Sequence, residues 1–246
     1  MAGLEPERRN VALVVVAHPD DAEFMAAGSV ATWAAEGWDV HYVICTDAAS
    51  GGPDDAEDVS PEARRAVSAV RKLEQRAACD VLGVKDIVFL DYPDGELQPS
   101  MLLRRDIVRA LRRYRPSRVV CQSPDRTWTP GYFIGAFHAD HLAAGQATIA
   151  AVYPASQNPW DFPELLEEGL PPHKVREVLF SGAPNANFAV DVSSTIERKL
   201  AALRAHTSQL AARFDEIEVW IRRRTAEVGK KHEMEYAEEF HRAENR

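Results

Sequence analysis

Continuous apolar runs alternate with amphipathic stretches along the first half of the chain. The run at residues 11–17 (VALVVVA) contains no polar side chain, as expected of a central strand that is covered on both faces. Runs rich in β-branched residues predict strands, and apolar positions that recur every three or four residues predict helices. This pattern gives strands at residues 11–17, 40–46, 87–90 and 118–122, and helices at residues 22–36, 61–82 and 101–114.

This alternation of strands and helices predicts an α/β fold. A β-α-β-α-β-α-β order favours a mostly parallel, Rossmann-like sheet that is flanked by helices in a single domain. No G-x-G-x-x-G follows the first strand, which argues against a nucleotide-dependent oxidoreductase. Ligands of parallel sheets bind beyond the carboxyl ends of the strands. The loops to inspect therefore begin after residues 17, 46, 90 and 122.

The second half of the chain has a looser pattern. A loop at residues 125–137 carries Trp128 and Tyr132, which either anchor the loop or stack on a ligand as part of a lid. Beyond it we expect a helix and two strands, at residues 138–152, 175–180 and 188–192. Residues 193–246 are expected to form a helical, highly charged segment. From Trp220 onward this segment is either a solvated helix or an oligomer contact.

Composition and charge narrow the class of protein. The 246 residues are 46% hydrophobic and 27% charged, which is typical of a soluble globular protein. No stretch approaches the roughly 18 apolar residues of a membrane span. The mixed-charge N-terminus and the three cysteines favour the cytoplasm. A net charge of −9 argues against nucleic acid as a partner. Six arginines are expected on the solvated face of one helix: Arg104, Arg105, Arg109, Arg112, Arg113 and Arg115.

Three residues that can bind a metal or move a proton follow the first strand directly. The segment AHPDDAEF places His18, Asp20 and Asp21 at the edge of the sheet where ligands bind. A turn, or an aspartate that caps the next helix, accounts for the proline and one carboxylate. It does not account for a histidine and two carboxylates within four residues. Because His18 and Asp21 lie three positions apart, one turn can direct both side chains at the same ion.

A second cluster lies just after the fourth predicted strand, at the start of a helix. His138 and His141 of FHADH are three residues apart and share one helix face. With His18 and Asp21, this cluster can complete a site of two histidines and one aspartate, which suits Zn²⁺ or Fe²⁺. Asp140 between the histidines either orients an imidazole or caps the helix.

Both clusters resemble the signatures of the LmbE-like deacetylases, also called the PIG-L or GlcNAc-PI de-N-acetylase family. AHPDDAEF is similar to the family's AHPDD(A/E), and HADH is similar to its H-P-D-H. RKLEQRAACDVLGV, DYPDGEL and VDVSSTIERKLAALRAHTSQ extend the similarity over most of residues 11–210. The resemblance implies one deacetylase domain over residues 1–246. His206 of AHTSQ is either a structural helix residue or a contact to the pocket or to a neighbouring subunit.

The resemblance also implies a role for each matched residue. It implies that His18, Asp21 and His141 are metal ligands, that Asp20 is the general base and that His138 stabilises the oxyanion. Arg71 and Asp94 match residues that contact a sugar substrate. Ala139 departs from the family's proline, which loosens the turn and removes no ligand.

The implied activity is removal of the N-acetyl group from a GlcNAc-type sugar or glycoconjugate by a zinc-dependent hydrolase. Fe²⁺ can replace Zn²⁺ in such a site in the cell. Asp20 would take the proton of the attacking water, and His138 would stabilise the oxyanion. Two alternatives remain open, an amidase acting on a larger thiol-sugar S-conjugate and a metal-bound sugar-binding protein without catalysis. We expect a small-molecule amino-sugar or glycoconjugate substrate and no membrane insertion. Family members are often multimeric, and for this chain a homo-oligomer and a monomer both remain open.

Overall fold

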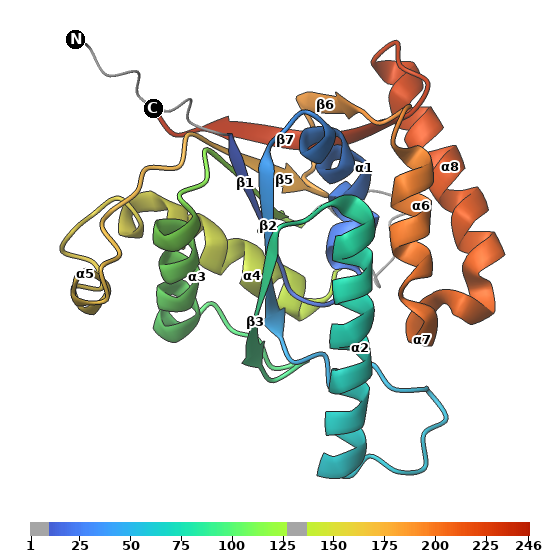
Figure 1. Ribbon diagram of the computed structural model, residues 1–246, viewed down its shortest axis with the longest axis horizontal. Coiled ribbons are helices and arrows are strands. Elements are labelled where there is room, and N and C mark those ends of the chain that lie inside the picture. The colour runs from blue at the N-terminus through green and yellow to red at the C-terminus, as the bar shows by residue number, and fades with distance from the viewer. Residues whose placement is uncertain (1–9, 127–136) are drawn as a thin grey trace.

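A computed structural model describes residues 10–126 and 137–246 (Figure 1). In this part of the chain, strands form one seven-stranded sheet in the order β3-β2-β1-β4-β5-β7-β6. The strands are β1 (Val11–Val16), β2 (Asp39–Thr46), β3 (Asp86–Tyr92), β4 (Arg118–Gln122), β5 (Glu177–Ser181), β6 (Phe188–Asp191) and β7 (Ala237–Glu244). The helices are α1 (Asp21–Ala35), α2 (Pro61–Leu82), α3 (Met101–Tyr114), α4 (Ala139–Ala150), α5 (Glu164–Glu167), α6 (Ile196–Arg204), α7 (Thr207–Leu210) and α8 (Phe214–Lys231), with a π-helical turn at Ala151–Ala155 and a 3₁₀ turn at Ala211–Arg213.

The sheet is covered by helices on both faces, as Figure 1 shows. Strands β3, β2, β1, β4 and β5 run parallel. The central strand β1 is apolar throughout because both of its faces are buried: Leu13 and Val15 pack with α3 and α4, and Ala12 and Val14 pack with α1 and α2. The predicted mostly parallel α/β sheet is confirmed. None of the helices in the described ranges is long and apolar enough to cross a bilayer.

The C-terminal segment is not wholly helical, contrary to the expectation for residues 193–246. It contains α6, α7 and α8 but ends in β7, which pairs antiparallel with both β5 and β6. The AEEFHRAE sequence hides this strand, because charged side chains predominate and only Phe240 is a large, fully buried apolar residue. Pairing on both sides and contacts such as Arg242 with Glu177 stabilise these charges within the sheet.

One arginine of the predicted solvated face of α3 is buried instead. Arg112 has only 1% of its surface exposed, and its guanidinium donates to backbone carbonyls at the end of the π-helical turn and after it. These acceptors, at 2.9–3.3 Å, are the carbonyl oxygens of Ala155, Ser156, Asn158 and Asp161. Periodicity assigns charged residues to solvent, and it cannot anticipate carbonyl groups that need a buried donor.

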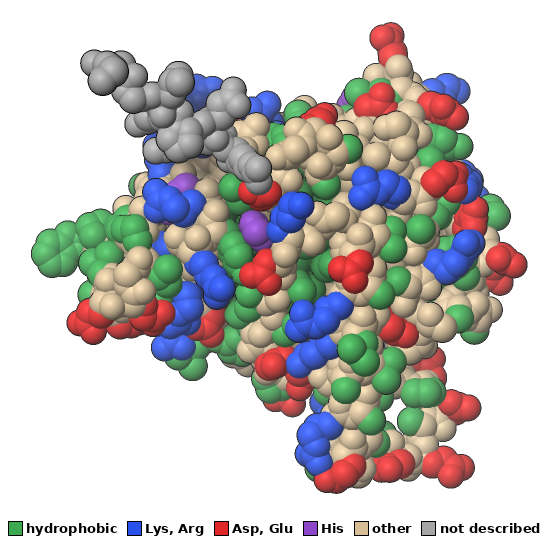
Figure 2. All heavy atoms as spheres, viewed as in Figure 1, with side chains coloured by type: hydrophobic (Ala, Val, Ile, Leu, Met, Phe, Trp, Pro, Cys, Tyr) green, Lys and Arg blue, Asp and Glu red, His purple; other side chains and the backbone are tan. Residues whose placement is uncertain are grey.

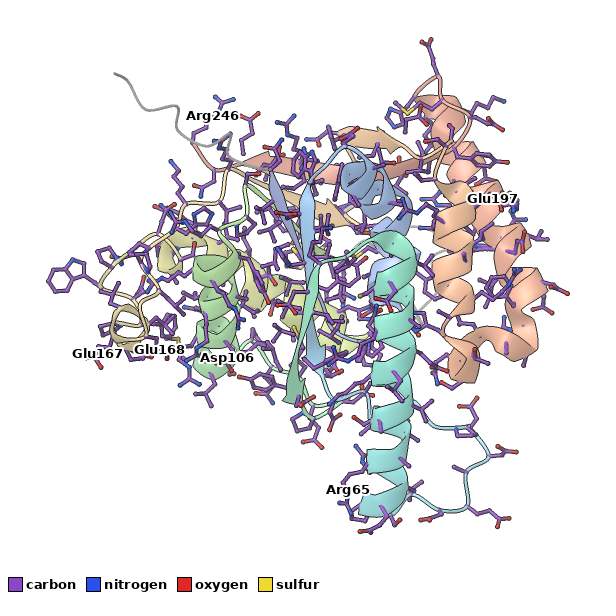
Figure 3. The ribbon with its side chains drawn as sticks, in the orientation of Figure 1. Arg65, Asp106, Glu167, Glu168, Glu197 and Arg246 are labelled. Atoms are coloured by element: carbon purple, nitrogen blue, oxygen red, sulfur yellow. The ribbon has the colours of Figure 1, made fainter. Side chains whose placement is uncertain are left out.

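Other charges of α3 are paired at the surface. Arg109 lies between Asp106 and Glu168, with nitrogen–oxygen distances of 2.7 and 2.9 Å, and Figure 3 labels both carboxylates beside α3 and α5. On the face drawn in Figure 2, Lys and Arg side chains are interspersed with Asp and Glu. This mixture differs from the continuous basic footprint that is typical of nucleic-acid-binding domains.

A buried ion pair joins β7 to α6, and its carboxylate also binds the backbone of α1. The Nζ of Lys199 lies 2.6 Å from Oε1 of Glu238, and the same carboxylate accepts hydrogen bonds from the amides of Gly28 and Ser29 at 3.0 and 2.7 Å. We expect Glu238→Ala to lower the free energy of unfolding by about 3–5 kcal/mol, because it leaves a buried ammonium group without its counter-ion. Chemical denaturation of the purified variant measures this loss.

The neighbouring Glu239→Ala is the matched control for that variant. Glu239 contacts Arg224 and Lys231 near the surface, at 3.3 and 3.4 Å. Pairs of this kind contribute less than about 1 kcal/mol, so the control should unfold close to the wild-type midpoint. Equal losses in the two variants would show that the buried Lys199–Glu238 pair stabilises the fold no more than a surface pair does.

Candidate metal centre and active site

The residues singled out in the sequence meet at the carboxyl edge of the parallel strands. His18 to Asp21 form the turn between β1 and α1, and His138 to His141 begin α4, which follows β4 in the chain. Asp94 lies in the loop after β3. Strand β1 pairs in parallel with both β2 and β4, so the loops that follow these strands emerge at the same edge of the sheet.

The turn after β1 is shaped by an unusual backbone conformation. Asp20 adopts a left-handed conformation with φ of 79°, which few residues other than glycine favour. Asp21 then begins α1, and its Oδ2 accepts hydrogen bonds from the His18 amide at 2.8 Å and from Gln122 Nε2 at 2.9 Å. Gln122 is held in turn by the Ala17 amide, which donates to its Oε1 at 3.1 Å. The turn therefore fixes the orientation of the Asp21 carboxylate.

Three imidazoles and the Asp21 carboxylate face one another in this site. Asp21 lies 3.0 Å from His141 Nε2 through Oδ1, and 3.4 Å from His18 Nδ1 through Oδ2. Ring nitrogens of His18, His138 and His141 lie within 4.8 Å of one another. Imidazole nitrogens and one carboxylate are the ligands that zinc and ferrous iron take in catalytic sites. The donor atoms present therefore fit such a metal ion.

Asp140 braces His18 from the side opposite Asp21. It is fully buried, its Oδ2 lies 3.0 Å from His18 Nε2, and its two oxygens accept from the amides of Gly95 and Leu97 at 2.8 and 3.1 Å. Of the two roles considered for Asp140, the helix cap belongs to another residue, since Nδ1 of His138 accepts from the Asp140 amide at 3.2 Å. A carboxylate behind an imidazole fixes its orientation and makes its other nitrogen a better ligand.

The electrostatics of the cluster keep its carboxylates charged. Burial alone would lower the pKa of His18, but hydrogen bonds to Asp140, Asp21 and Asp94 outweigh it and raise that pKa to about 11. Burial would raise the pKa of Asp21, yet the neighbouring His141 and His18 hold it well below its usual value. The pKa of His138 is lowered, first by burial and then by the positive charge of His18. The site is thus rich in negative charge that a cation can neutralise.

Asp20 has a different environment from Asp21. Burial, and then the negative charge of Asp21, raise the pKa of Asp20 to about 7, against the opposing effect of Arg71. The Nη2 of Arg71 lies 3.4 Å from Asp20 Oδ2 and donates to the Pro19 carbonyl at 3.1 Å, while its Nη1 lies 4.0 Å from Asp94 Oδ2. Asp20 is therefore a carboxyl group whose pKa suits proton transfer near neutral pH.

Sequence reasoning missed the polar residues behind Asp20. Gln75 on α2 is fully buried, and its Oε1 accepts from the Asp20 amide at 3.0 Å while its Nε2 donates to Glu23 at 3.0 Å. Glu23 is itself fully buried, so it acts here as a hydrogen-bonding partner of Gln75. One signal points to Gln75: it lies four residues after Arg71, on the same face of a helix.

Two adjoining hollows open beside the cluster. One of about 310 Å³ is lined by Asp21, His138 and His141. A larger one of about 620 Å³ lies between α8, β7 and the connection from β5 to β6, and it contains none of the candidate catalytic residues. The two share the lining residues Phe24, Met25, Ser181 and Gly182, so they lie next to each other. Trp128 and Tyr132, considered as parts of a lid, lie outside the described residues.

Comparisons with known proteins agree on one family. The family model of the GlcNAc-PI de-N-acetylases (PIG-L) matches residues 13–152. Diacetylchitobiose deacetylase of Thermococcus kodakarensis is 34% identical over 228 residues, which are 92% of this chain and 80% of that protein. A probable N-acetyl-alpha-D-glucosaminyl L-malate deacetylase 2 of Bacillus anthracis is 29% identical, covering 83% of this chain and 84% of that protein.

The fold points to the same group of proteins. The structure of N,N'-diacetylchitobiose deacetylase from Pyrococcus horikoshii, bound to an inhibitor, superposes with a TM-score of 0.84 at 28% identity. The match covers 97% of this chain and 85% of that one. The resemblance seen in the two short motifs thus extends to the family model, to full-length relatives and to the fold. The chain belongs to the GlcNAc-PI de-N-acetylase (PIG-L) family.

Proposed function

We propose that this protein is a metal-dependent N-deacetylase that hydrolyses the acetamide of a GlcNAc-type unit. The observation that carries the proposal is the convergence of His18, Asp21 and His141 beside Asp20, at the edge of an open hollow. The relatives from Thermococcus and Bacillus are deacetylases of N-acetylated sugars, and this similarity supports the same reaction class for this chain.

His18, Asp21 and His141 are the residues that would hold the metal, which we propose to be Zn²⁺, or Fe²⁺ in the cell. When bound, such an ion polarises the acetamide carbonyl and makes a water molecule more acidic. Asp140 keeps the His18 ring in place through its contact with Nε2. His138 has a nitrogen within 4.8 Å of the other two imidazoles, close enough to reach the reacting group.

Asp20 is proposed as the general base of the hydrolysis. Its carboxylate accepts a proton from the water that attacks the acetamide carbon, and His138 donates a hydrogen bond to the oxyanion that forms there. The carbon–nitrogen bond then breaks, the proton goes to the amine, and acetate is released. Asp20 and Asp21 are adjacent carboxyl groups with displaced pKa values of opposite sense, a usual sign of separate roles in catalysis.

The sugar is proposed to contact Arg71 and Asp94 through its hydroxyl groups. These two side chains lie next to each other, with Nη1 4.0 Å from Oδ2, beside Asp20 and His18. The adjacent hollow favours a substrate larger than one sugar, since the space beyond Phe24 and Met25 has a volume of about 620 Å³. A disaccharide or a glycoside would place its second unit there. Trp220, 46% exposed on α8, offers an aromatic face along this path.

The test is acetate release from a panel of N-acetylglucosamine, its methyl glycoside and N,N'-diacetylchitobiose. We expect kcat/KM for the disaccharide to exceed that for the monosaccharide by roughly tenfold, which corresponds to modest extra binding of the transition state. Chelation should abolish release and added Zn²⁺ should restore it. A zinc-loaded protein that binds these sugars without releasing acetate would favour the sugar-binding alternative. Cleavage of a thiol-sugar S-conjugate, assayed beside this panel, with no acetate release from the panel itself would favour the amidase.

A further inference from the structure

We propose that the turn formed by His206, Thr207, Ser208 and Gln209, called the 206–209 turn below, positions two functional groups of the site separately. His206 orients Asp20 through a chain of buried hydrogen bonds. Gln209 binds a backbone carbonyl of the loop that supports Arg71. The inference rests on the proposed function, because it concerns the same deacetylase site. None of the four residues lines the hollow beside the metal cluster, within the part of the chain that is described.

The His206 branch is a chain of buried hydrogen bonds that ends at Asp20. His206 and Glu23 are both fully buried, with Nε2 of His206 lying 3.2 Å from Oε2 of Glu23. The other oxygen of Glu23 accepts from Gln75 Nε2, so the amide of Gln75 must turn its oxygen toward Asp20. That oxygen accepts from the Asp20 amide at 3.0 Å.

The hydrogen bond from the Asp20 amide to Gln75 stabilises a backbone conformation of Asp20 that is unfavourable by itself. Asp20 has φ of 79°, and a residue other than glycine is held in that region only when its surroundings favour it. The Gln75 amide and the Arg71 guanidinium supply such partners, at the Asp20 amide and at the Pro19 carbonyl. Loss of His206 would free Glu23, and with it the orientation of Gln75, so the Asp20 carboxylate would lose its fixed direction.

The Gln209 branch ends at different groups. Nε2 of Gln209 donates to the carbonyl of Gly51 at 2.8 Å. Gly51 is packed so closely on Arg71 that a Cβ at this position would overlap the guanidinium. The preceding residue, Ser50, donates to Asp94 from its amide at 3.0 Å and from its hydroxyl at 3.1 Å. Gln209 therefore holds the loop that supports both proposed sugar contacts.

Ser208 anchors the turn between the two branches. Its amide and its hydroxyl both donate to the Glu74 carboxylate on α2, at 2.6 and 2.7 Å. Glu74 immediately precedes Gln75 and lies three residues after Arg71. One short turn is thereby attached to α1, to α2 and to the loop after β2, which are the elements that carry or support Asp20, Arg71 and Asp94.

The experiment compares kcat and KM for Gln209→Ala, His206→Leu and His206→Gln, on metal-loaded full-length protein. Gln209→Ala should raise KM about fivefold to tenfold and leave kcat within about twofold, because it loosens the loop behind the substrate contacts while the Gln75 hydrogen bond to the Asp20 amide remains. His206→Leu should lower kcat by about 10- to 100-fold with KM little changed, since small displacements of a catalytic group have effects of this size. His206→Gln should recover part of kcat, because its amide can donate to Glu23.

Arg204→Ala is the control, since Arg204 lies two residues before the turn and pairs with Glu218 at the surface instead. It should leave both constants unchanged, and all variants should retain the metal content of the wild type. If His206→Leu does not fold, Gln209→Ala and His206→Gln still test the inference, because the first should change KM and the second should change kcat. If the variants at both positions change kcat and KM in the same way, or change neither constant, this inference is wrong while the proposed function stands. A wild type without acetate release overturns the proposed function and this inference with it.

Discussion

Asp20→Asn is expected to lower kcat for acetate release by about 10³-fold while the protein keeps its metal. The amide of asparagine has the size of the carboxylate but cannot accept a proton from water at neutral pH, and general-base catalysis contributes about 10²–10⁴-fold. The metal should remain because its proposed ligands, His18, Asp21 and His141, are untouched. Single-turnover kinetics, together with metal analysis of the same sample, measures both quantities.

The pH dependence of kcat/KM tests the role of Asp20 independently. Only the deprotonated carboxylate acts as a base, so a pKa raised to about 7 makes kcat/KM fall as the pH drops below that value. The positive charge of a bound metal ion lowers this pKa, which places the acidic limb of the pH profile, where kcat/KM falls, at or below pH 7. The limb should be absent from the residual activity of Asp20→Asn.

Asp91→Asn is the matched control. Asp91 is also an aspartate with a positive φ, 59°, near the carboxyl end of a parallel strand, but it is exposed and pairs with Lys72. Its replacement should leave kcat and the pH profile unchanged. If Asp20→Asn turned over every accepted substrate at the wild-type rate, Asp20 would not be the base and the proposed mechanism would be wrong.

The place of the candidate site could be predicted because its residues follow strands directly in the sequence. His18 and Asp21 come straight after β1, and His141 lies near the start of the helix that follows β4. The continuous apolar run of β1 identifies a strand that is buried on both faces, and such strands lie at the centre of parallel sheets. The local sequence pattern and the topology of parallel sheets are therefore sufficient to predict that the two motifs lie at one edge of the sheet.

The polar network behind the site could not be predicted, since it depends on pairings between distant residues. Gln75 is 55 positions from Asp20, and His206 is 183 positions from Glu23. Helical periodicity gives the face of α2 on which Gln75 lies but not the amide that it meets across the core. The strand β7 was hidden for the same reason, because tertiary partners such as Lys199 stabilise its charged side chains.

His141→Ala is expected to remove the metal and, with it, the hydrolase activity. A catalytic zinc site has three protein ligands, so the loss of one leaves too few to retain the ion through purification. Loss of residues that merely orient ligands weakens metal binding by about 10–100-fold, and loss of a ligand should exceed that range. Elemental mass spectrometry of anaerobically purified protein should find about one zinc or iron per wild-type chain and none in the variant.

Two comparisons make this result specific. His41→Ala removes an imidazole that stacks on Tyr114, away from the cluster, and should leave the metal content unchanged. Asp140→Asn should retain the ligands but bind the metal about 10–100-fold more weakly, because His18 loses the carboxylate that orients it. If His141→Ala kept its metal with wild-type affinity, the ligand set would have to exclude His141. A wild-type protein that carries no metal and takes up no added zinc would instead contradict the metal-dependent mechanism itself.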